Sequence, residues 1–201
     1  LLKPSFTPTS PDFKTLKLDG TYLGIDIGSV SVKVVCVANE GIVFSDYCFS
    51  EGLPTNILNN IFTKMKEKIG TVKFSGVGIT GSGRHFIGKL VGADTIQNEI
   101  TAQAKSANFI LPGVESVVEI GGQDAKFLSL KDGRVTHFSM NRVCAAGTGA
   151  FLQEQAKRLN IALGDFADEA FASSNPASLG ARCTVFMESD LVSHQQQGYA
   201  K

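Results

Sequence analysis

The fold is decided by a short stretch near the start of the chain, Gly24-Ile-Asp-Ile-Gly-Ser-Val-Ser-Val-Lys33. An aspartate lies inside an apolar strand pattern, and a glycine, two serines and a lysine follow it. A buried carboxylate is costly unless it meets a cation or hydrogen-bond donors, which Mg²⁺ and its waters can supply. Gly28 permits a turn whose backbone amides, helped by Ser29, Ser31 and Lys33, can surround phosphate oxygens. Taken alone, the stretch fits a strand followed by a plain hairpin equally well.

A second stretch, Glu119-Ile-Gly-Gly-Gln-Asp-Ala-Lys126, repeats this design with an apolar strand, a glycine pair and then polar and acidic groups. Two such hairpins facing one another would hold the γ-phosphate of a nucleotide between two backbone turns. They would present Asp26, Gln123 and Asp124 to Mg²⁺ and water. The pair of stretches therefore predicts nucleotide binding much more specifically than either stretch alone.

The spacing of apolar residues on either side of these stretches predicts an alternation of strands and helices. Residues 22–49 predict two strands joined by a tight turn at Glu40-Gly41. Further strands are expected at 73–80, 116–120, 125–130 and 135–139, with a hairpin turn at Asp132-Gly133. Helices are expected at 53–69, 84–91, 99–110, 149–159, 165–172 and 184–196. This order predicts an α/β protein, with a mixed sheet flanked by helices, that binds its ligand where strands end and helices begin.

Composition and charge narrow the class of protein. The chain has 201 residues, 43% of them hydrophobic and 19% charged, which is typical of a folded globular protein. Its 19 basic and 19 acidic side chains leave no net charge, so nothing in the charge favours nucleic acid or an anionic membrane as partner. No apolar run approaches the roughly 20 residues that span a bilayer, and the N-terminus lacks a signal-peptide layout. We expect a cytoplasmic protein that binds neither nucleic acid nor membrane.

The first residues, Leu1-Leu-Lys-Pro-Ser-Phe-Thr-Pro-Thr-Ser-Pro11, are rich in proline and hydroxyl groups. They predict a linker cut from a longer polypeptide. We therefore expect a linker-like leader over 1–20 and a first subdomain, with the first hairpin, over 21–110. A second subdomain, with the second hairpin and two cysteines, is expected over 111–201 and is expected to be incomplete.

Two of the four cysteines precede predicted helices. Cys144 stands before Ala-Ala-Gly-Thr-Gly and Cys183 before Thr-Val-Phe-Met-Glu-Ser. Each is therefore expected at or beside a helix N-terminus, where the helix dipole favours a thiolate. A [4Fe-4S] cluster takes four thiolates, and a two-fold homodimer would supply these two cysteines twice. The alternative is two semi-buried thiols with packing roles, as is expected for Cys36 and Cys48 in their apolar strand patterns.

Four motifs resemble those of one known family. They are Thr80-Gly-Ser-Gly-Arg84, Gly121-Gly-Gln-Asp124, Met140-Asn-Arg-Val-Cys-Ala-Ala-Gly-Thr-Gly149 and Cys183-Thr-Val-Phe-Met-Glu-Ser189. With the paired hairpins, they resemble the ATP-dependent activators of 2-hydroxyacyl-CoA dehydratases and the related ATPase subunits of benzoyl-CoA reductase, in the actin, Hsp70 and sugar-kinase superfamily. The resemblance runs from about residue 22 to the end of the chain. It implies an actin-like ATPase fold of the ribonuclease H-like type.

The resemblance also implies an activity, its cofactors and its partners. Such an activase uses ATP and Mg²⁺ to send one low-potential electron from a dimer-bridging [4Fe-4S] cluster to an iron–sulfur dehydratase or reductase that acts on a CoA thioester. Reduced ferredoxin or flavodoxin is the implied electron donor. The implied nucleotide-binding residues are Gly28, Ser29, Ser31, Lys33, Gly121, Gly122, Gly147, Thr148 and Gly149, and the implied catalytic residues are Asp26, Gln123, Asp124 and Glu99. Cys144 and Cys183 would bind the cluster, and Asp26 would bind the Mg²⁺.

The sequence departs from the family pattern at several points. Glu119 replaces the usual aspartate of the second phosphate loop, Ser82 stands where tyrosine is usual, and Arg142-Val143 stand where Asp-Lys is usual. The adenine-binding glycine segment that should follow the second half is absent. Glu99 fits two roles, the acidic residue of the family's cleft-side helix or an exposed helix-cap carboxylate.

Two other functions remain open. A sugar- or acyl-kinase relative would share both hairpins and transfer the γ-phosphate to a small hydroxyl or carboxylate without needing Cys144 or Cys183. A non-catalytic nucleotide-binding module within a longer protein would bind ATP weakly without turnover. Under the activase interpretation, the isolated chain is expected to be catalytically weak.

Overall fold

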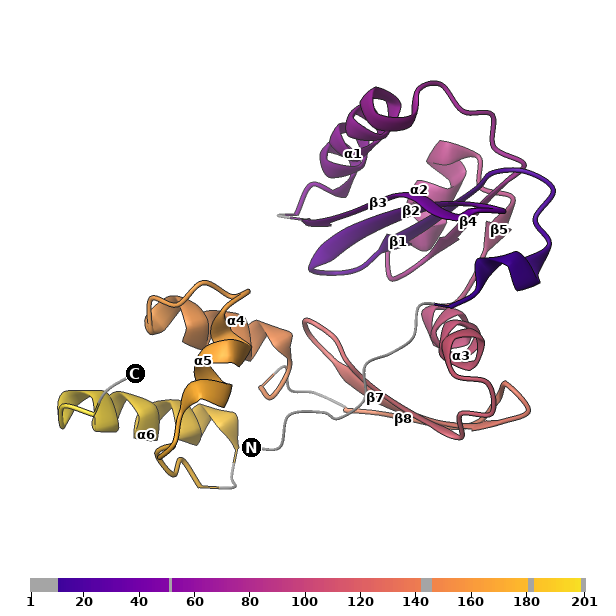
Figure 1. Ribbon diagram of the computed structural model, residues 1–201. Helices are drawn as coiled ribbons and strands as arrows, with labels where there is room; N and C mark the ends of the chain where they lie inside the picture. Colours follow the sequence, from indigo (N-terminus) through magenta and orange to yellow (C-terminus); the bar gives the residue numbers. More distant parts are fainter. Residues whose placement is uncertain (1–10, 51, 142–145, 181–182, 200–201) are drawn as a thin grey trace. The chain divides into compact units, whose positions relative to one another are not determined.

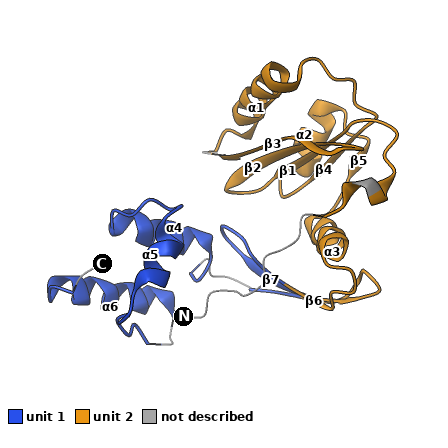
Figure 2. Cartoon of the chain, in the orientation of Figure 1, with its two compact units in different colours: residues 1–7, 118–127, 139–201 blue, residues 8–117, 128–138 orange. Residues whose placement is uncertain are grey.

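The computed structural model describes residues 11–50, 52–141, 146–180 and 183–199 (Figure 1). The chain forms two compact units (Figure 2). The N-terminal unit comprises the described parts of 8–117 and 128–138, and the C-terminal unit comprises those of 118–127 and 139–201. Half of the expected leader, residues 1–10, lies outside the described residues. The expected subdomain boundary at 110–111 stays a prediction.

A five-stranded mixed sheet forms the centre of the N-terminal unit. Its strands are β1 (Tyr22–Ile27), β2 (Ser31–Ala38), β3 (Gly41–Phe49), β4 (Gly76–Thr80) and β5 (Thr95–Ile96), in the spatial order β3-β2-β1-β4-β5. Strand β2 runs antiparallel to β1 and β3, whereas β4 runs parallel to β1 and β5. The mixed sheet that the sequence predicts is thus confirmed.

Residues 22–49 form three strands, so the prediction of two strands there is wrong. The apolar alternation of residues 22–38 is interrupted at Gly28-Ser29, where the N–H of Gly28 donates to the carbonyl of Ser31 at 2.9 Å and the chain reverses between β1 and β2. An apolar pattern alone does not show where a strand turns back on itself. Strand β5 is not predicted either, because its two residues are both exposed and carry no alternation.

The helices of this unit match their predicted ranges closely. They are α1 (Pro54–Ile69), α2 (Arg84–Val91) and α3 (Glu99–Ile110), preceded by a short 3-10 helix, Phe13–Leu16. Proline suits the first turn of α1 because the N–H that it lacks has no partner within the helix there. Asn98 caps α3, since its side-chain oxygen accepts a hydrogen bond from the N–H of Ile100 at 2.8 Å.

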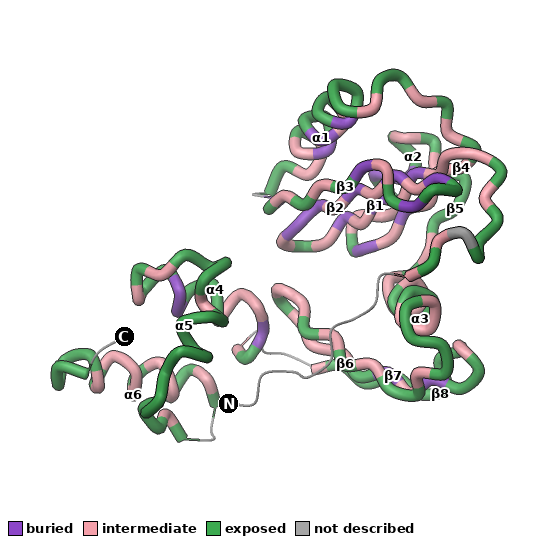
Figure 3. The backbone as a smooth tube through the Cα atoms, in the orientation of Figure 1, coloured by how far each residue is buried: buried purple, intermediate pink, exposed green. Residues whose placement is uncertain are grey.

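The core fixes which face of the sheet carries the first hairpin's acidic residue. Leu23, Ile25 and Ile27 of β1 are at most 5% exposed and share one apolar cluster with Ile61 of α1. Figure 3 shows buried segments in this sheet and in α1. Because successive side chains of a strand point to opposite faces, Asp26 lies on the face away from this cluster. The core therefore holds the strand while leaving its carboxylate accessible.

A second sheet has three strands, β6 (Ser116–Ile120), β7 (Ala125–Lys131) and β8 (Arg134–Met140), in that order. The division between the units passes through it. Asp132 and Gly133 both have positive φ angles, 51° and 70°, as the two central residues of a type I′ hairpin require. The hairpin predicted at this dipeptide is confirmed.

The helices described in the C-terminal unit are α4 (Gly149–Arg158), α5 (Phe166–Ala172) and α6 (Thr184–Gln196). Their bounds lie within one residue of the predicted ranges. An ion pair of 2.6 Å between Arg158 and Glu188 joins α4 to α6. Among the described residues, no helix combines the length and the apolar character that crossing a membrane would demand.

Candidate functional site

The first hairpin joins β1 to β2 and brings Asp26 and Lys33 together. The two residues are register partners in the antiparallel ladder, and Lys33 Nζ lies 2.9 Å from Asp26 Oδ2. The side chain of Lys33 is 41% exposed and that of Asp26 is 32% exposed, so the ion pair is open to solvent. An exposed pair of this kind is weak, and a stronger ligand can replace either partner. The hairpin therefore offers one carboxylate and one ammonium that are free to exchange.

The loop after β4 packs against the end of β1. The N–H of Gly83 donates to the carbonyl of Ile27 at 3.0 Å, and the hydroxyl of Ser82 donates to the same oxygen at 3.3 Å. Gly81 has φ +90°, and a Cβ at this position would lie 2.5 Å from Asp26 Oδ1 and closer still to the carbonyl oxygen of Ile27. Only glycine fits here. The Thr-Gly-Ser-Gly-Arg motif thus supports the acidic end of β1 from one side.

Arg84 connects this loop to the start of α3. Its Nη1 donates to the carbonyl of Gly81 at 3.0 Å and to Glu99 Oε2 at 2.7 Å. Glu99 is the first residue of α3, but Asn98 provides the side-chain cap. Of the two roles considered for Glu99, capping by its carboxylate is therefore not what the structure shows. Its catalytic role stays a prediction.

A pocket with a volume of about 790 Å³ opens on the sheet face that carries Asp26. Asp26, Lys33, Tyr47, Thr80 and Gln97 are among the residues that line it. Thr80 is the register partner of Asp26 in the parallel ladder, and its buried hydroxyl has no hydrogen-bond partner among the described residues. A carboxylate and a hydroxyl are oxygen donors of the kind that Mg²⁺ prefers. This end of β1 and β4 therefore fits a Mg²⁺ ion.

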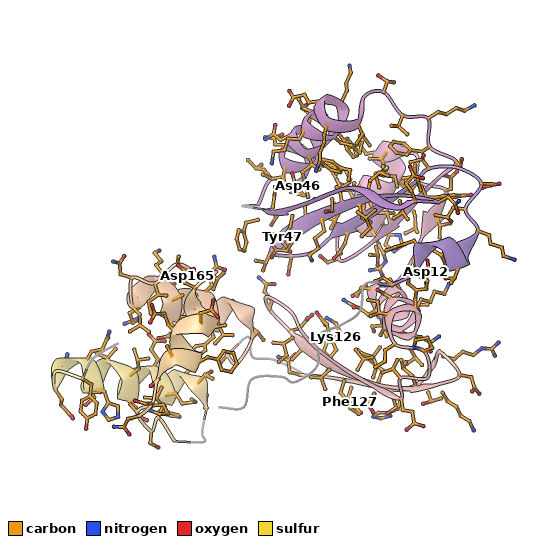
Figure 4. All side chains as sticks on the ribbon, in the orientation of Figure 1. Asp12, Asp46, Tyr47, Lys126, Phe127 and Asp165 are labelled. Carbon is orange, nitrogen blue, oxygen red and sulfur yellow. The ribbon has the colours of Figure 1, made fainter. Side chains whose placement is uncertain are left out.

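The second hairpin joins β6 to β7, and Lys126 is the second residue of β7 (Figure 4). The ammonium of Lys126 lies 3.0 Å from Glu119 Oε2 and 2.5 Å from Asp124 Oδ1, and its side chain is only 9% exposed. Burial lowers the pKa of Lys126, but its hydrogen bonds to Asp124 and Glu119 outweigh burial and leave that pKa above its usual value. Gln123 is exposed at the turn.

The sequence interpretation gave no role to Lys126. The sequence feature that could have indicated this role is the spacing of seven residues between Glu119 and Lys126, which equals the spacing between Asp26 and Lys33.

The second hairpin is bonded to the start of α4. The hydroxyl of Thr148, which is 1% exposed, donates to the carbonyl of Gly122 at 2.9 Å. The N–H groups of Gly149 and Ala150 donate to the carbonyls of Gly121 and Gly122, both at 2.9 Å. The structure thus brings together four of the predicted site residues. The amides at the start of α4 already have acceptors in the hairpin, so the direct phosphate contact predicted for this turn, Gly147 included, stays a prediction.

The cysteines differ in burial. Cys183 is the N-cap residue of α6 and is exposed, which confirms its predicted place at a helix N-terminus. Cys144 lies outside the described residues. Cys36 is fully buried, and burial raises the pKa of its thiol, while Cys48 is partly buried. In the described part of the chain, no three His, Cys, Asp or Glu side chains lie close enough together to hold a metal ion among themselves. Among the cysteines that the structure describes, Cys183 has the exposure that a thiolate shared with a second chain would need.

Solved structures share this architecture. The activator of the 2-hydroxyisocaproyl-CoA dehydratase from Clostridium difficile, with bound ADPNP, has a TM-score of 0.79 at 36% sequence identity, over 89% of this chain and 67% of that one. Component A of the (R)-2-hydroxyglutaryl-CoA dehydratase of Acidaminococcus fermentans has a TM-score of 0.80 at 32% identity, over 91% and 71%. The protein is therefore an α/β protein of the actin-like ATPase class, as the sequence predicted.

Sequence similarity identifies the family within this class. The chain matches the BadF/BadG/BcrA/BcrD ATPase family over residues 23–201, and it belongs to that family. The 2-hydroxyisocaproyl-CoA dehydratase activator of Clostridioides difficile is 35% identical over 175 residues, which are 86% of this chain and 65% of that protein. The chain thus spans slightly less than two thirds of this relative's length.

Proposed function

We propose that the protein acts as an ATP-dependent activase. It would donate a low-potential electron from a dimer-bridging [4Fe-4S] cluster to a 2-hydroxyacyl-CoA dehydratase or a related CoA-thioester reductase. Membership of the ATPase family supports the use of ATP, and the similarity to a solved dehydratase activator and to a solved dehydratase component A supports the class of partner. A homodimer, reduced ferredoxin or flavodoxin as electron donor, and a cytoplasmic location complete the proposal.

The first hairpin is assigned to Mg²⁺ and phosphate. Asp26 and Thr80 would hold the ion, which when bound offsets the negative charge of the phosphate groups. Lys33 is 41% exposed, so its ammonium can leave Asp26 for a phosphate oxygen once the metal occupies the carboxylate. The hydroxyls of Ser29 and Ser31 would add donors to the same oxygens.

The second hairpin is assigned to phosphate and to the attacking water. Gln123 is exposed, and the side chain of Asp124 is 44% exposed, so both can bond to water. Together they would orient the water that attacks the γ-phosphate. Glu99 would act through Arg84, which holds the loop beside Asp26.

Electron transfer is assigned to two cysteines in each of two chains. Cys144 and Cys183 from both protomers would supply the four thiolates of a cubane, which when bound supplies a one-electron donor. Raising one electron by roughly 300 mV costs about 7 kcal/mol, because 59 mV corresponds to about 1.4 kcal/mol for a one-electron step. ATP hydrolysis supplies free energy on this scale. The exposed Cys183 at the N-cap of α6 is suited to bind metal outside the chain's own core.

One observation carries the coupling between ATP and the cluster. The carbonyls of Gly121 and Gly122 accept hydrogen bonds from Thr148, Gly149 and Ala150, so the second hairpin is bonded to the segment that follows Cys144. A shift of the hairpin on binding phosphate therefore moves the start of α4. Changes of this kind are discrete, because a packed helix end has few alternative positions.

Anaerobic reconstitution with iron and sulfide tests the proposal. The full-length protein and a Cys48→Ser control, whose cysteine is partly buried in β3, should hold about four irons per dimer. Cys144→Ser and Cys183→Ser should each lose the iron and the visible absorption, while size-exclusion reports the dimer. A full-length protein without iron would contradict the electron-donor role and favour a kinase.

A further inference from the structure

The two hairpins have the same arrangement of an ion pair and a backbone turn bond. In each, an acidic residue on the first strand is followed seven residues later by a lysine on the second strand, and the two side chains form an ion pair. The same backbone hydrogen bond closes each turn. The ion pairs are Asp26 with Lys33 and Glu119 with Lys126, and the turn bonds run from Gly28 to Ser31 and from Gly121 to Asp124.

Although the arrangement is the same, the environments of the two lysines differ. Lys33 is 41% exposed and meets one carboxylate, whereas Lys126 is 9% exposed and meets two, those of Glu119 and Asp124. Charge-assisted hydrogen bonds strengthen as water is excluded. Removing the ammonium of Lys126 would leave two carboxylates close together without a counter-ion, which is strongly unfavourable. Lys126 is therefore fixed in place, and Lys33 is not.

Two carboxylates held this close offer what a divalent cation normally binds. In the second hairpin an ammonium already lies between them. We propose that Lys126 is the resident cation of this hairpin, which occupies the position that a metal would need between Glu119 and Asp124. The metal of MgATP is then confined to Asp26 at the first hairpin, and the second hairpin contributes backbone groups and water-orienting side chains only. The assignment of the nucleotide's metal rests on the proposed function, whereas the role of Lys126 as internal cation does not.

Titration with Mn²⁺, followed by the electron paramagnetic resonance of the free ion, tests this role without nucleotide. Lys126→Met should bind about one further Mn²⁺ per chain, at least about tenfold more tightly than the unchanged protein does. Lys126→Arg keeps the cation and should bind no further Mn²⁺, and Lys64→Met, the control in the exposed ion pair with the single carboxylate of Asp46, should bind none further either. Adding Glu119→Gln to Lys126→Met should abolish the extra ion. Mn²⁺ should also raise the melting temperature of Lys126→Met but not that of the control.

A folded Lys126→Met variant that binds no more Mn²⁺ than the unchanged protein overturns the proposal. If that variant does not fold, the proposal is tested by the Mn²⁺ affinity of two other variants in the presence of a non-hydrolysable ATP analogue. Asp26→Asn should weaken it at least about tenfold and Glu119→Gln should leave it unchanged. An equal loss in both variants refutes the role of Lys126. If ATP binding is retained in that case, the proposed function still stands. Failure of the role of Lys126 can therefore be distinguished from failure of the proposed function.

Discussion

Replacing Gly81 by alanine should weaken nucleotide binding strongly while lowering the stability of the fold only moderately. Gly81 has φ +90°, and its Cβ would collide with the carbonyl of Ile27 and with the carboxylate of Asp26. A non-glycine residue in this backbone region costs about 1–2 kcal/mol. The Cβ would also lie about 1 Å closer to backbone than ordinary contact allows, so the end of β1 must move.

These two effects together give an expected loss of about 2–4 kcal/mol in the free energy of unfolding. For a chain of this size, that loss corresponds to a fall in melting temperature of roughly 4–15 °C. The forced movement of Asp26 should weaken MgATP binding by about 10–100-fold, because displacing a positioned group by about 1 Å has effects of that size.

Gly92→Ala is the matched control. Gly92 also has a positive φ, +66°, at the end of α2, but nothing lies within 4 Å of its Cβ position. It should therefore show the backbone cost alone, about 1–2 kcal/mol, with normal nucleotide binding. Thermal unfolding and calorimetric titration with a non-hydrolysable ATP analogue measure both quantities. If Gly81→Ala proves no less stable than the control and binds the analogue normally, the reasoning about the loop and Asp26 is refuted.

Three further changes have clear expected outcomes. Ile61→Ala empties a fully buried position in α1 and should cost about 2–5 kcal/mol in urea unfolding, whereas Asn60→Ala, on the exposed face, should cost less than about 0.5 kcal/mol. Thr148→Val removes the buried hydroxyl that bonds the second hairpin and should cost about 1–3 kcal/mol, and calorimetry showing no loss would contradict that contact's importance. The Lys64 hydrogen bond holds the pKa of Asp46 below its usual value, so this pair stabilises the fold above about pH 4 and the contribution is lost as the pH falls further. Lys64→Met should therefore lower stability at pH 7 and make little difference at pH 3, and an equal effect at both pH values would argue against the ion pair.

Local patterns in the sequence determined much of the architecture. The helices follow from apolar spacing and end signals within single stretches, as Pro54 and Gly70 show at the two ends of α1. The turn at Asp132-Gly133 follows from two neighbouring residues that accept positive φ. The residue types of the two glycine hairpins predict phosphate binding, and that assignment stays a prediction.

Tertiary structure alone decided the partners of the charged and hydroxyl groups. Thr148 bonds a carbonyl 26 residues away and Ser82 one 55 residues away, and no local pattern encodes such pairs. The capping of α3 by Asn98 and the pairing of Glu99 with Arg84 were equally unpredictable, because nearby polar residues compete for the same role. The hairpin residues were readable in the sequence because strand, turn and lysine lie within one short stretch. Their burial, which separates an exchangeable ion pair from a fixed one, depends on the residues that pack around each hairpin, and these come from distant parts of the chain.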